Sequence, residues 1–238
     1  MKPIAIFRFS RTEGPGHFAT FLDANALPWT LVRLDEDDAV PGTSEPFAGL
    51  GFMGGPMSAN DELPWTAPVL ALMRDAAARR VPMIGHCLGG QLMSRALGGR
   101  VSRNPVKEIG WVRVEAEPSA AAREWLGDGV RGFESFQWHE DAFTVPDGGV
   151  RILSGATCAN QAYVADGLHL GMQCHVEMDI GMIETWCRTG SGEIDESLGK
   201  GAAVQDVATI RRLAATLLPG LSATADRLYT RWIRGLRR

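Results

Sequence analysis

The segment from Val81 to Met93 places the tightest constraint on how this chain can fold. It reads VPMIGHCLGGQLM, a short apolar run followed by a cysteine between glycines and then by a helix-like stretch. A buried strand that turns sharply into a helix has this pattern. Gly85 and Gly89 suit such a turn because glycine offers permissive backbone angles and little side-chain bulk. The sequence therefore predicts a strand–turn–helix unit that projects Cys87.

Apolar runs and helix-like stretches alternate through the first half of the chain. Strands are expected at residues 3–9, 30–34, 50–53 and 81–85, and helices at 18–25 and 64–80, with Pro64 in the first turn of the latter. Strand candidates separated by helices favour parallel pairing. This half is therefore predicted to form a doubly wound parallel sheet.

Strand candidates become closely spaced after residue 108. They fall at residues 109–115, 133–139, 151–154, 161–165 and 168–175, a spacing that favours hairpins and antiparallel pairs. Helices are expected afterwards at 178–188, 204–217 and 223–236. The whole pattern predicts an α/β fold with a mostly parallel central sheet flanked by helices, an antiparallel section in the second half and a helical C-terminal tail.

Length and charge exclude several classes of protein. The 238 residues contain no repeat or linker, so we expect one domain over residues 1–238, with no room for a synthetase. The formal net charge of −4 gives no basic field for nucleic acid or anionic lipid. No apolar run approaches the roughly 20 residues of a membrane span, and Arg8 and Arg11 interrupt a signal-peptide pattern. We expect a cytoplasmic protein with neither nucleic acid nor membrane as partner.

Cys87 has the setting of a nucleophile. The start of a helix favours negative charge, and this stabilises a thiolate there by roughly 0.3 to 2 kcal/mol. The alternative is a buried structural cysteine at a glycine-rich strand end. The flanking strand, glycines and helix favour the nucleophile, because a nucleophile elbow requires that context.

His175 and Glu177 are the candidates for the base and for the acid that orients it. If the strand that starts near residue 168 continues to residue 177, both side chains point to the same face of the sheet. A carboxylate could then hold the imidazole, which completes the set of nucleophile, base and orienter. The alternative is a surface pair at a strand end, which the elbow at Cys87 disfavours.

Residues 85–91, GHCLGGQ, together with His175-Val176-Glu177 closely resemble the motifs of class I, triad-type glutamine amidotransferases. These motifs are G-x-C-x-G-x-Q and a later H-x-E, and the chain is most similar to stand-alone, GMP-synthase-like members. The resemblance in motifs extends from about residue 54 to residue 177. Val176 departs from the usual proline, and His86 from the usual small apolar residue. Strand alternation points His86 away from Cys87, which favours a structural role.

The resemblance implies a reaction and three catalytic residues. Cys87 would attack the γ-amide of glutamine, ammonia would leave, and water would hydrolyse the γ-glutamyl thioester. His175 would move the protons, and Glu177 would stabilise the imidazolium. No cofactor is implied. No metal is expected either, because the cysteines fit no compact zinc motif.

The resemblance also implies an oxyanion hole and substrate contacts. The N–H of Leu88 follows the nucleophile, and Gly55 lies in a G-G-P run, which as a bare tripeptide also fits a simple tight turn. Gln91 matches a glutamine that contacts the substrate, although it also fits a polar residue of a first helical turn. Trp138 and His139 fall in a segment similar to the family's W-x-S-H-G-D, with Trp138 in place of serine and Glu140 in place of glycine. Trp138 also fits a core position.

Three functions stay open on the sequence. The first is a glutaminase that supplies ammonia to a separate synthetase or acceptor enzyme. The second is a γ-glutamyl peptidase, which uses the same chemistry on γ-glutamyl peptides or conjugates. The third is a non-catalytic regulatory module that keeps the fold. A substrate panel on the wild type and on Cys87→Ala separates them.

Overall fold

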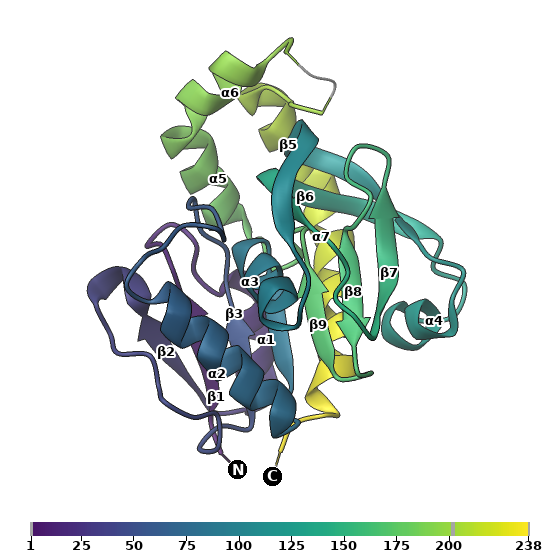
Figure 1. Cartoon of the computed structure of the whole chain (residues 1–238). Helices are drawn as coiled ribbons and strands as arrows, with labels where there is room; N and C mark the ends of the chain where they lie inside the picture. Colours follow the sequence, from purple (N-terminus) through teal and green to yellow (C-terminus); the bar gives the residue numbers. More distant parts are fainter. Residues whose placement is uncertain (1, 201–202, 238) are drawn as a thin grey trace.

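A nine-stranded mixed sheet, in the order β2-β1-β3-β4-β9-β8-β7-β5-β6, forms the centre of the molecule (Figure 1). The computed structural model describes residues 2–200 and 203–237. Strands β2, β1, β3, β4 and β9 pair in parallel, and the remaining pairs are antiparallel. The strands are β1 (Ile4–Arg8), β2 (Trp29–Arg33), β3 (Gly49–Phe52), β4 (Met83–His86), β5 (Val101–Ala116), β6 (Gly132–Phe143), β7 (Gly149–Gly155), β8 (Ala162–Ala165) and β9 (His169–Met172).

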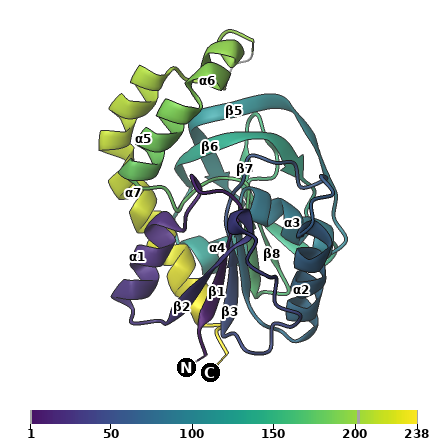
Figure 2. The ribbon, with the colours of Figure 1, turned by 90° about the vertical axis from the view of Figure 1, so that its left-hand side faces the viewer.

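Helices cover both faces of the sheet. In Figure 2, α1, α5 and α7 lie on one side of the sheet, while α2 and α3 lie on the other. The helices are α1 (Gly16–Ala24), α2 (Thr66–Ala78), α3 (Leu88–Ala96), α4 (Ala120–Leu126), α5 (Ile180–Thr189), α6 (Ser191–Ser197) and α7 (Val207–Ile233), with a 3₁₀ turn η1 (Leu34–Glu36) after β2. The predicted α/β class, the parallel half and the antiparallel section are confirmed.

The parallel strands follow the apolar runs of the sequence. Strands β1, β3 and β4 are almost entirely buried, as expected where helices cover both faces of a parallel sheet. The helix predicted at 64–80 is α2, but its start was placed wrongly. Pro64 precedes the helix, whereas Pro68 lies in its first turn, where a missing N–H leaves no helical hydrogen bond unmade.

The antiparallel section is longer than predicted at one end and shorter at the other. Strand β5 starts at Val101 rather than at residue 109, because its first residues pair with the end of β6 before a register shift between Arg103 and Glu108. Strand β9 ends at Met172 rather than at residue 175. The short helices α4 and α6 were not predicted. Ser119 caps α4 by accepting a hydrogen bond from the N–H of Ala122.

The two helices predicted at 204–217 and 223–236 are one continuous helix, α7. Pro219 lies inside it, although proline costs about 3 kcal/mol in a helix interior. Buried residues on both sides of Pro219, including Ala214, Leu221 and Leu228, pack on the core. Burial of a large apolar side chain contributes about 1.5–3 kcal/mol, so this packing outweighs the break that the local sequence favours.

The end of α7 is a packed amphipathic helix. Leu228 and Trp232 are buried, while Arg231 forms an ion pair with Glu124 and lies over the ring of Trp125. Among the helices of residues 2–200 and 203–237, none combines enough length and apolar character to cross a membrane.

Candidate active site

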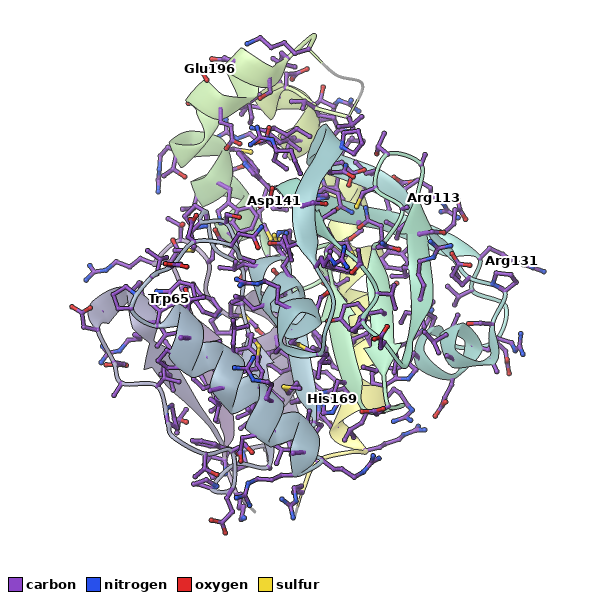
Figure 3. All side chains as sticks on the ribbon, viewed as in Figure 1. Trp65, Arg113, Arg131, Asp141, His169 and Glu196 are labelled. Atoms are coloured by element: carbon purple, nitrogen blue, oxygen red, sulfur yellow. The ribbon has the colours of Figure 1, made fainter. Side chains whose placement is uncertain are left out.

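The candidate site lies where four adjacent parallel strands end. Strands β1, β3, β4 and β9 point the same way, so the segments that follow them meet at one edge of the sheet. These segments and the end of β6 surround a pocket of about 440 Å³, which Cys87, Gly55 and Gln91 help to line. Figure 3 labels Asp141, which lines the pocket, and His169 at the opposite end of β9.

Cys87 occupies the junction between β4 and α3 in a strained conformation. Its φ of 47° and ψ of −107° are unusual for a residue with a side chain, and such a conformation costs about 1–3 kcal/mol. Hydrogen bonds hold it in place, from the N–H of Cys87 to the carbonyl of Met172 at 2.8 Å and from the N–H of Gln91 to the carbonyl of Cys87 at 2.9 Å. The side chain is 6% exposed and lines the pocket.

Gly85 and Gly89 are required for their small size and not for their backbone angles. Neither has a positive φ; within the elbow that conformation belongs to Cys87 itself. A Cβ at Gly85 would lie 2.5 Å from the carbonyl carbon of Gly89, and a Cβ at Gly89 would overlap the backbone of Phe52. The elbow therefore depends on close contact between the backbones of β3, β4 and α3.

Two backbone N–H groups beside Cys87 are free to bind a ligand. The N–H groups of Gly55 and Leu88 have no backbone partner among the described residues. The two residues are neighbours, because a Cβ at Gly55 would lie 2.6 Å from Cδ2 of Leu88. The loop after β3 is joined to α3 by a hydrogen bond from the N–H of Gly89 to the carbonyl of Met53, 3.1 Å long. The arrangement can stabilise negative charge next to the Cys87 sulfur.

His175 and Glu177 form a buried pair below the pocket. The Nδ1 atom of His175 lies 2.6 Å from Oε1 of Glu177, and each residue is 1% exposed. The predicted reason for their proximity was wrong, because β9 ends at Met172 and neither residue belongs to a continuous strand. His175 instead forms an isolated bridge with Phe136 of β6, in which its N–H donates to the Phe136 carbonyl at 2.9 Å.

The charges of this pair reinforce each other. Burial by itself would lower the pKa of His175, but the Glu177 carboxylate and the nearby Cys87 raise it well above its usual value. Burial would raise the pKa of Glu177, and His175 holds it below its usual value instead. The Nε2 atom of His175 is buried without a hydrogen-bond partner among the described residues, so it can exchange a proton with a reacting group.

His86 lies on the far side of Glu177 from His175. Its Nε2 atom is 3.9 Å from Oε2 of Glu177 and 3.2 Å from the hydroxyl of Tyr229. Burial lowers the pKa of His86 despite the neighbouring carboxylate. A neutral imidazole in contact with Tyr229 fits the predicted structural role, which stays a prediction.

Gln91 reaches Cys87 through a second glutamine. Its Nε2 atom donates to Oε1 of Gln173 at 3.1 Å and to the carbonyl of Asp141 at 3.1 Å. Gln173 in turn donates from Nε2 to the sulfur of Cys87 at 3.5 Å. Gln91 therefore lines the pocket with both amide hydrogens already engaged, which leaves its side-chain carbonyl to meet a ligand.

Trp138 and His139 line the pocket, but His139 is engaged elsewhere. Its Nε2 lies 2.7 Å from Oε2 of Glu108, and its Nδ1 lies 3.0 Å from the carbonyl of Asp141. Trp138 donates from Nε1 to Oε2 of Glu193 at 2.9 Å. The ligand atoms of Glu108, His139 and Cys158 lie within 4.8 Å of one another, and hydrogen bonds already occupy both nitrogens of His139.

The family model that describes class-I glutamine amidotransferases matches residues 21–185. The chain belongs to this family. The glutamine amidotransferase from Methylobacillus flagellatus has a crystal structure with a TM-score of 0.97 to this chain, 46% sequence identity, and coverage of 100% of this chain and 96% of that one. Membership supports glutamine amide hydrolysis as the general chemistry of the site.

Two further relatives of this amidotransferase chain are informative. The glutamine amidotransferase-like protein YfeJ of Salmonella typhimurium is 24% identical over 204 residues, with 84% of this chain and 85% of that protein covered. A subunit of the glutamine-hydrolysing GMP synthase of Sulfolobus acidocaldarius is 31% identical over 159 residues, covering 66% of this chain and 80% of that one. The matches to Pseudomonas GMP synthases span 25% of the length of those proteins.

Two pocket residues of this family member were missed by the sequence reasoning. Glu13 follows β1, and Trp186 belongs to α5; both line the pocket. The ring of Trp186 meets the ring of His175 edge-on, with 4.9 Å between centroids. The signal for Glu13 was available, because the segment after β1 has to reach the same sheet edge as the segment after β4. No local pattern marks Trp186.

Proposed function

We propose that the protein hydrolyses the γ-amide of glutamine through a thioester on Cys87 and releases ammonia for a separate acceptor enzyme. One observation carries the proposal: a strained cysteine lines a pocket next to two backbone N–H groups that have no backbone partner among the described residues, and the His175–Glu177 pair is buried close by. The proposal treats residues 1–238 as one glutamine amidotransferase domain.

In the first half-reaction the sulfur of Cys87 attacks the γ-carbonyl carbon, and the thiol proton passes to Nε2 of His175. The N–H groups of Gly55 and Leu88 hold the oxyanion that forms, an interaction in which one donor is worth about 10²- to 10³-fold in rate. His175 then returns the proton to the nitrogen as the C–N bond breaks. Glu177 holds the imidazole in place and stabilises its protonated form.

In the second half-reaction water attacks the thioester. His175 takes a proton from the water, and the same two N–H groups hold the second oxyanion. The C–S bond then breaks with its electron pair on sulfur, His175 returns the proton to Cys87, and glutamate is released. Gln91 and Trp138 stand where the amino-acid end of the substrate would bind. His139 supports this wall of the pocket through Glu108 and Asp141.

The proposed acceptor of the ammonia is an enzyme on another chain. The support is the Sulfolobus relative, whose name makes it one of the subunits of a glutamine-hydrolysing GMP synthase. Co-purification of the tagged full chain from its source, followed by identification of any synthetase, tests this partner.

Covalent labelling tests the nucleophile. A glutamine-derived diazoketone should modify Cys87 in the wild-type protein. Peptide mass mapping should then find the label on the peptide that contains Cys87, and no labelled peptide in Cys87→Ser. Burial raises the pKa of Cys158 and Cys174 to about 12, so these buried thiols serve as internal controls. Labelling at either of them, with Cys87 untouched, contradicts the proposal.

A γ-glutamyl peptidase is the second candidate. The pocket continues from Cys87 to Thr189, Gly190 and Glu193 at the junction of α5 and α6, which leaves space for a leaving group larger than ammonia. Ammonia release from glutamine and amine release from γ-glutamyl dipeptides should be compared in wild type and Cys87→Ala. Turnover of dipeptides without turnover of glutamine favours the peptidase, and no turnover of either favours a non-catalytic module.

A further inference from the structure

Glu13 brings a carboxyl group to the reacting centre. Gly54 has no side chain, and the space that a Cβ would occupy there is filled by Oε2 of Glu13. The same point lies 3.2 Å from Cε1 of His175, the ring carbon bonded to Nε2. Glu13 and Cys87 line the same pocket. The carboxyl of Glu13 therefore stands over Gly54, at the edge of the imidazole that handles the protons.

The segment that carries Glu13 is fastened on both sides. Before Glu13, the indole N–H of Trp186 donates to the carbonyl of Thr12 at 2.7 Å. After it, the N–H of His17 donates to the carbonyl of Glu177 at 2.8 Å. Both anchors belong to the elements that hold His175 itself. Glu13 is thus placed relative to the His175–Glu177 pair and not on a loose loop.

The Glu13 carboxyl is unusual because it makes no ion pair with any of the residues that the structure describes. Among the described residues no hydrogen bond acts on it, and burial raises its pKa to about 7, although the charge of His175 opposes that change. A carboxyl that is half-buried and unpaired costs stability unless a ligand completes its hydrogen bonds. Its position in the pocket makes the substrate the natural partner.

The side of the pocket on which Glu13 stands identifies the part of the substrate that it meets. A nitrogen that receives a proton from Nε2 of His175 has to leave on the His175 side of the tetrahedral intermediate. We propose that Glu13 is a catalytic residue that accepts a hydrogen bond from the N–H of the leaving nitrogen, and so favours substrates whose leaving group is an amine or ammonia. This inference rests on the proposed function.

The role requires no additional proton transfer. When the C–N bond breaks, its electron pair stays on nitrogen, which takes the proton of His175, while the carbonyl carbon keeps its new bond to the Cys87 sulfur. Glu13 only accepts a hydrogen bond from an N–H already on that nitrogen. Positive charge that develops on the nitrogen as it is protonated strengthens this bond, so the contact is worth more in the transition state than in the bound substrate.

A comparison of amide and ester substrates separates a contact with the leaving nitrogen from contacts with the rest of the substrate. An ester of the same acyl group shares the γ-glutamyl part, the oxyanion and the thioester, but its leaving oxygen has no N–H. We expect Glu13→Gln to lower kcat/KM for glutamine by about 10- to 100-fold, as for loss of a charge-assisted hydrogen bond, and to change kcat/KM for glutamate γ-methyl ester by less than about threefold. The ratio kcat/KM is the readout because it covers the steps up to departure of the leaving group.

Two further variants serve as controls for Glu13→Gln. Glu196→Gln removes an exposed carboxylate from α6, labelled in Figure 3, and should leave both substrates unaffected. Glu13→Asp keeps the charge but shortens its reach, so it should restore part of the lost amide activity. An equal loss of kcat/KM on amide and ester, in a variant that unfolds at or above the wild-type temperature, overturns the role of Glu13 alone. A wild type that turns over neither substrate overturns the proposed function and this inference with it.

Discussion

The imidazole of His175 is held by Glu177 two residues later in the chain, with 2.6 Å between Nδ1 and Oε1 and both side chains buried. The pair lies in the segment between β9 and α5, outside any continuous strand. Its geometry comes from the bridge to Phe136 and from the packing of Trp186. Contacts from distant parts of the chain therefore set up this pair.

The first prediction concerns the pH dependence of stability. Because the pKa of His175 is raised in the folded state, its full contribution to stability is present below about pH 6.5. This contribution is lost as pH rises through the raised pKa. The lowered pKa of Glu177 contributes stability that is present above about pH 4.5 and is lost as pH falls through the lowered value. In urea unfolding, Glu177→Gln should lower the free energy of unfolding most between these two pH values, and the difference from wild type should shrink below and above them. A loss that is equal at every pH contradicts this pairing.

The second prediction concerns the strain at Cys87. Cys87→Ala and Cys87→Gly both remove the sulfur, but only glycine adopts a positive φ without steric cost. We expect Cys87→Gly to be more stable than Cys87→Ala by about 1 kcal/mol, from differential scanning calorimetry, with both variants inactive. Equal stability of the two variants would show that the backbone at this position is relaxed.

The third prediction concerns the glycines of the elbow. Gly85→Ala places a Cβ 2.5 Å from the backbone of Gly89, and neither backbone can move freely. We expect this substitution to destabilise the protein by about 2 kcal/mol or more and to abolish labelling of Cys87. Gly220→Ala is the matched control, since its Cβ meets nothing within 4 Å in α7 and should stabilise by about 0.5–1 kcal/mol.

The fourth prediction concerns Glu13 in the absence of substrate. Its pKa is raised to about 7, so the folded state holds a proton that the unfolded chain has already lost. Wild-type stability should therefore fall by about 1.4 kcal/mol per pH unit between about pH 4.5 and 7 from this group. Glu13→Gln should lack this fall and be the more stable protein at pH 8. Parallel stability curves for the two proteins would contradict a half-buried, unpaired carboxyl.

Local patterns in the sequence predicted the elbow and the parallel strands. Residues 81–93 carry their own strand, turn and helix signals, and the strand expected at residues 50–53 is β3 (Gly49–Phe52). The motifs also predicted Cys87, His175 and Glu177 as one group, which the structure brings together, while their roles remain proposals. Strand alternation was the wrong explanation for His175 and Glu177.

Long-range packing decided the remaining features. Pro219 predicts a break in the C-terminal helix, but packing of α7 on the core keeps the helix continuous. The small size of Gly85 matters only because the backbone of Gly89 lies against it. Glu13 carries no motif, and it reaches His175 because the parallel strands β1 and β9 end at the same edge of the sheet. The sequence by itself determined which residues have reactive groups and which segments form strands. Only the tertiary structure decided which of them meet, because contacts between distant segments depend on sheet order and not on local propensity.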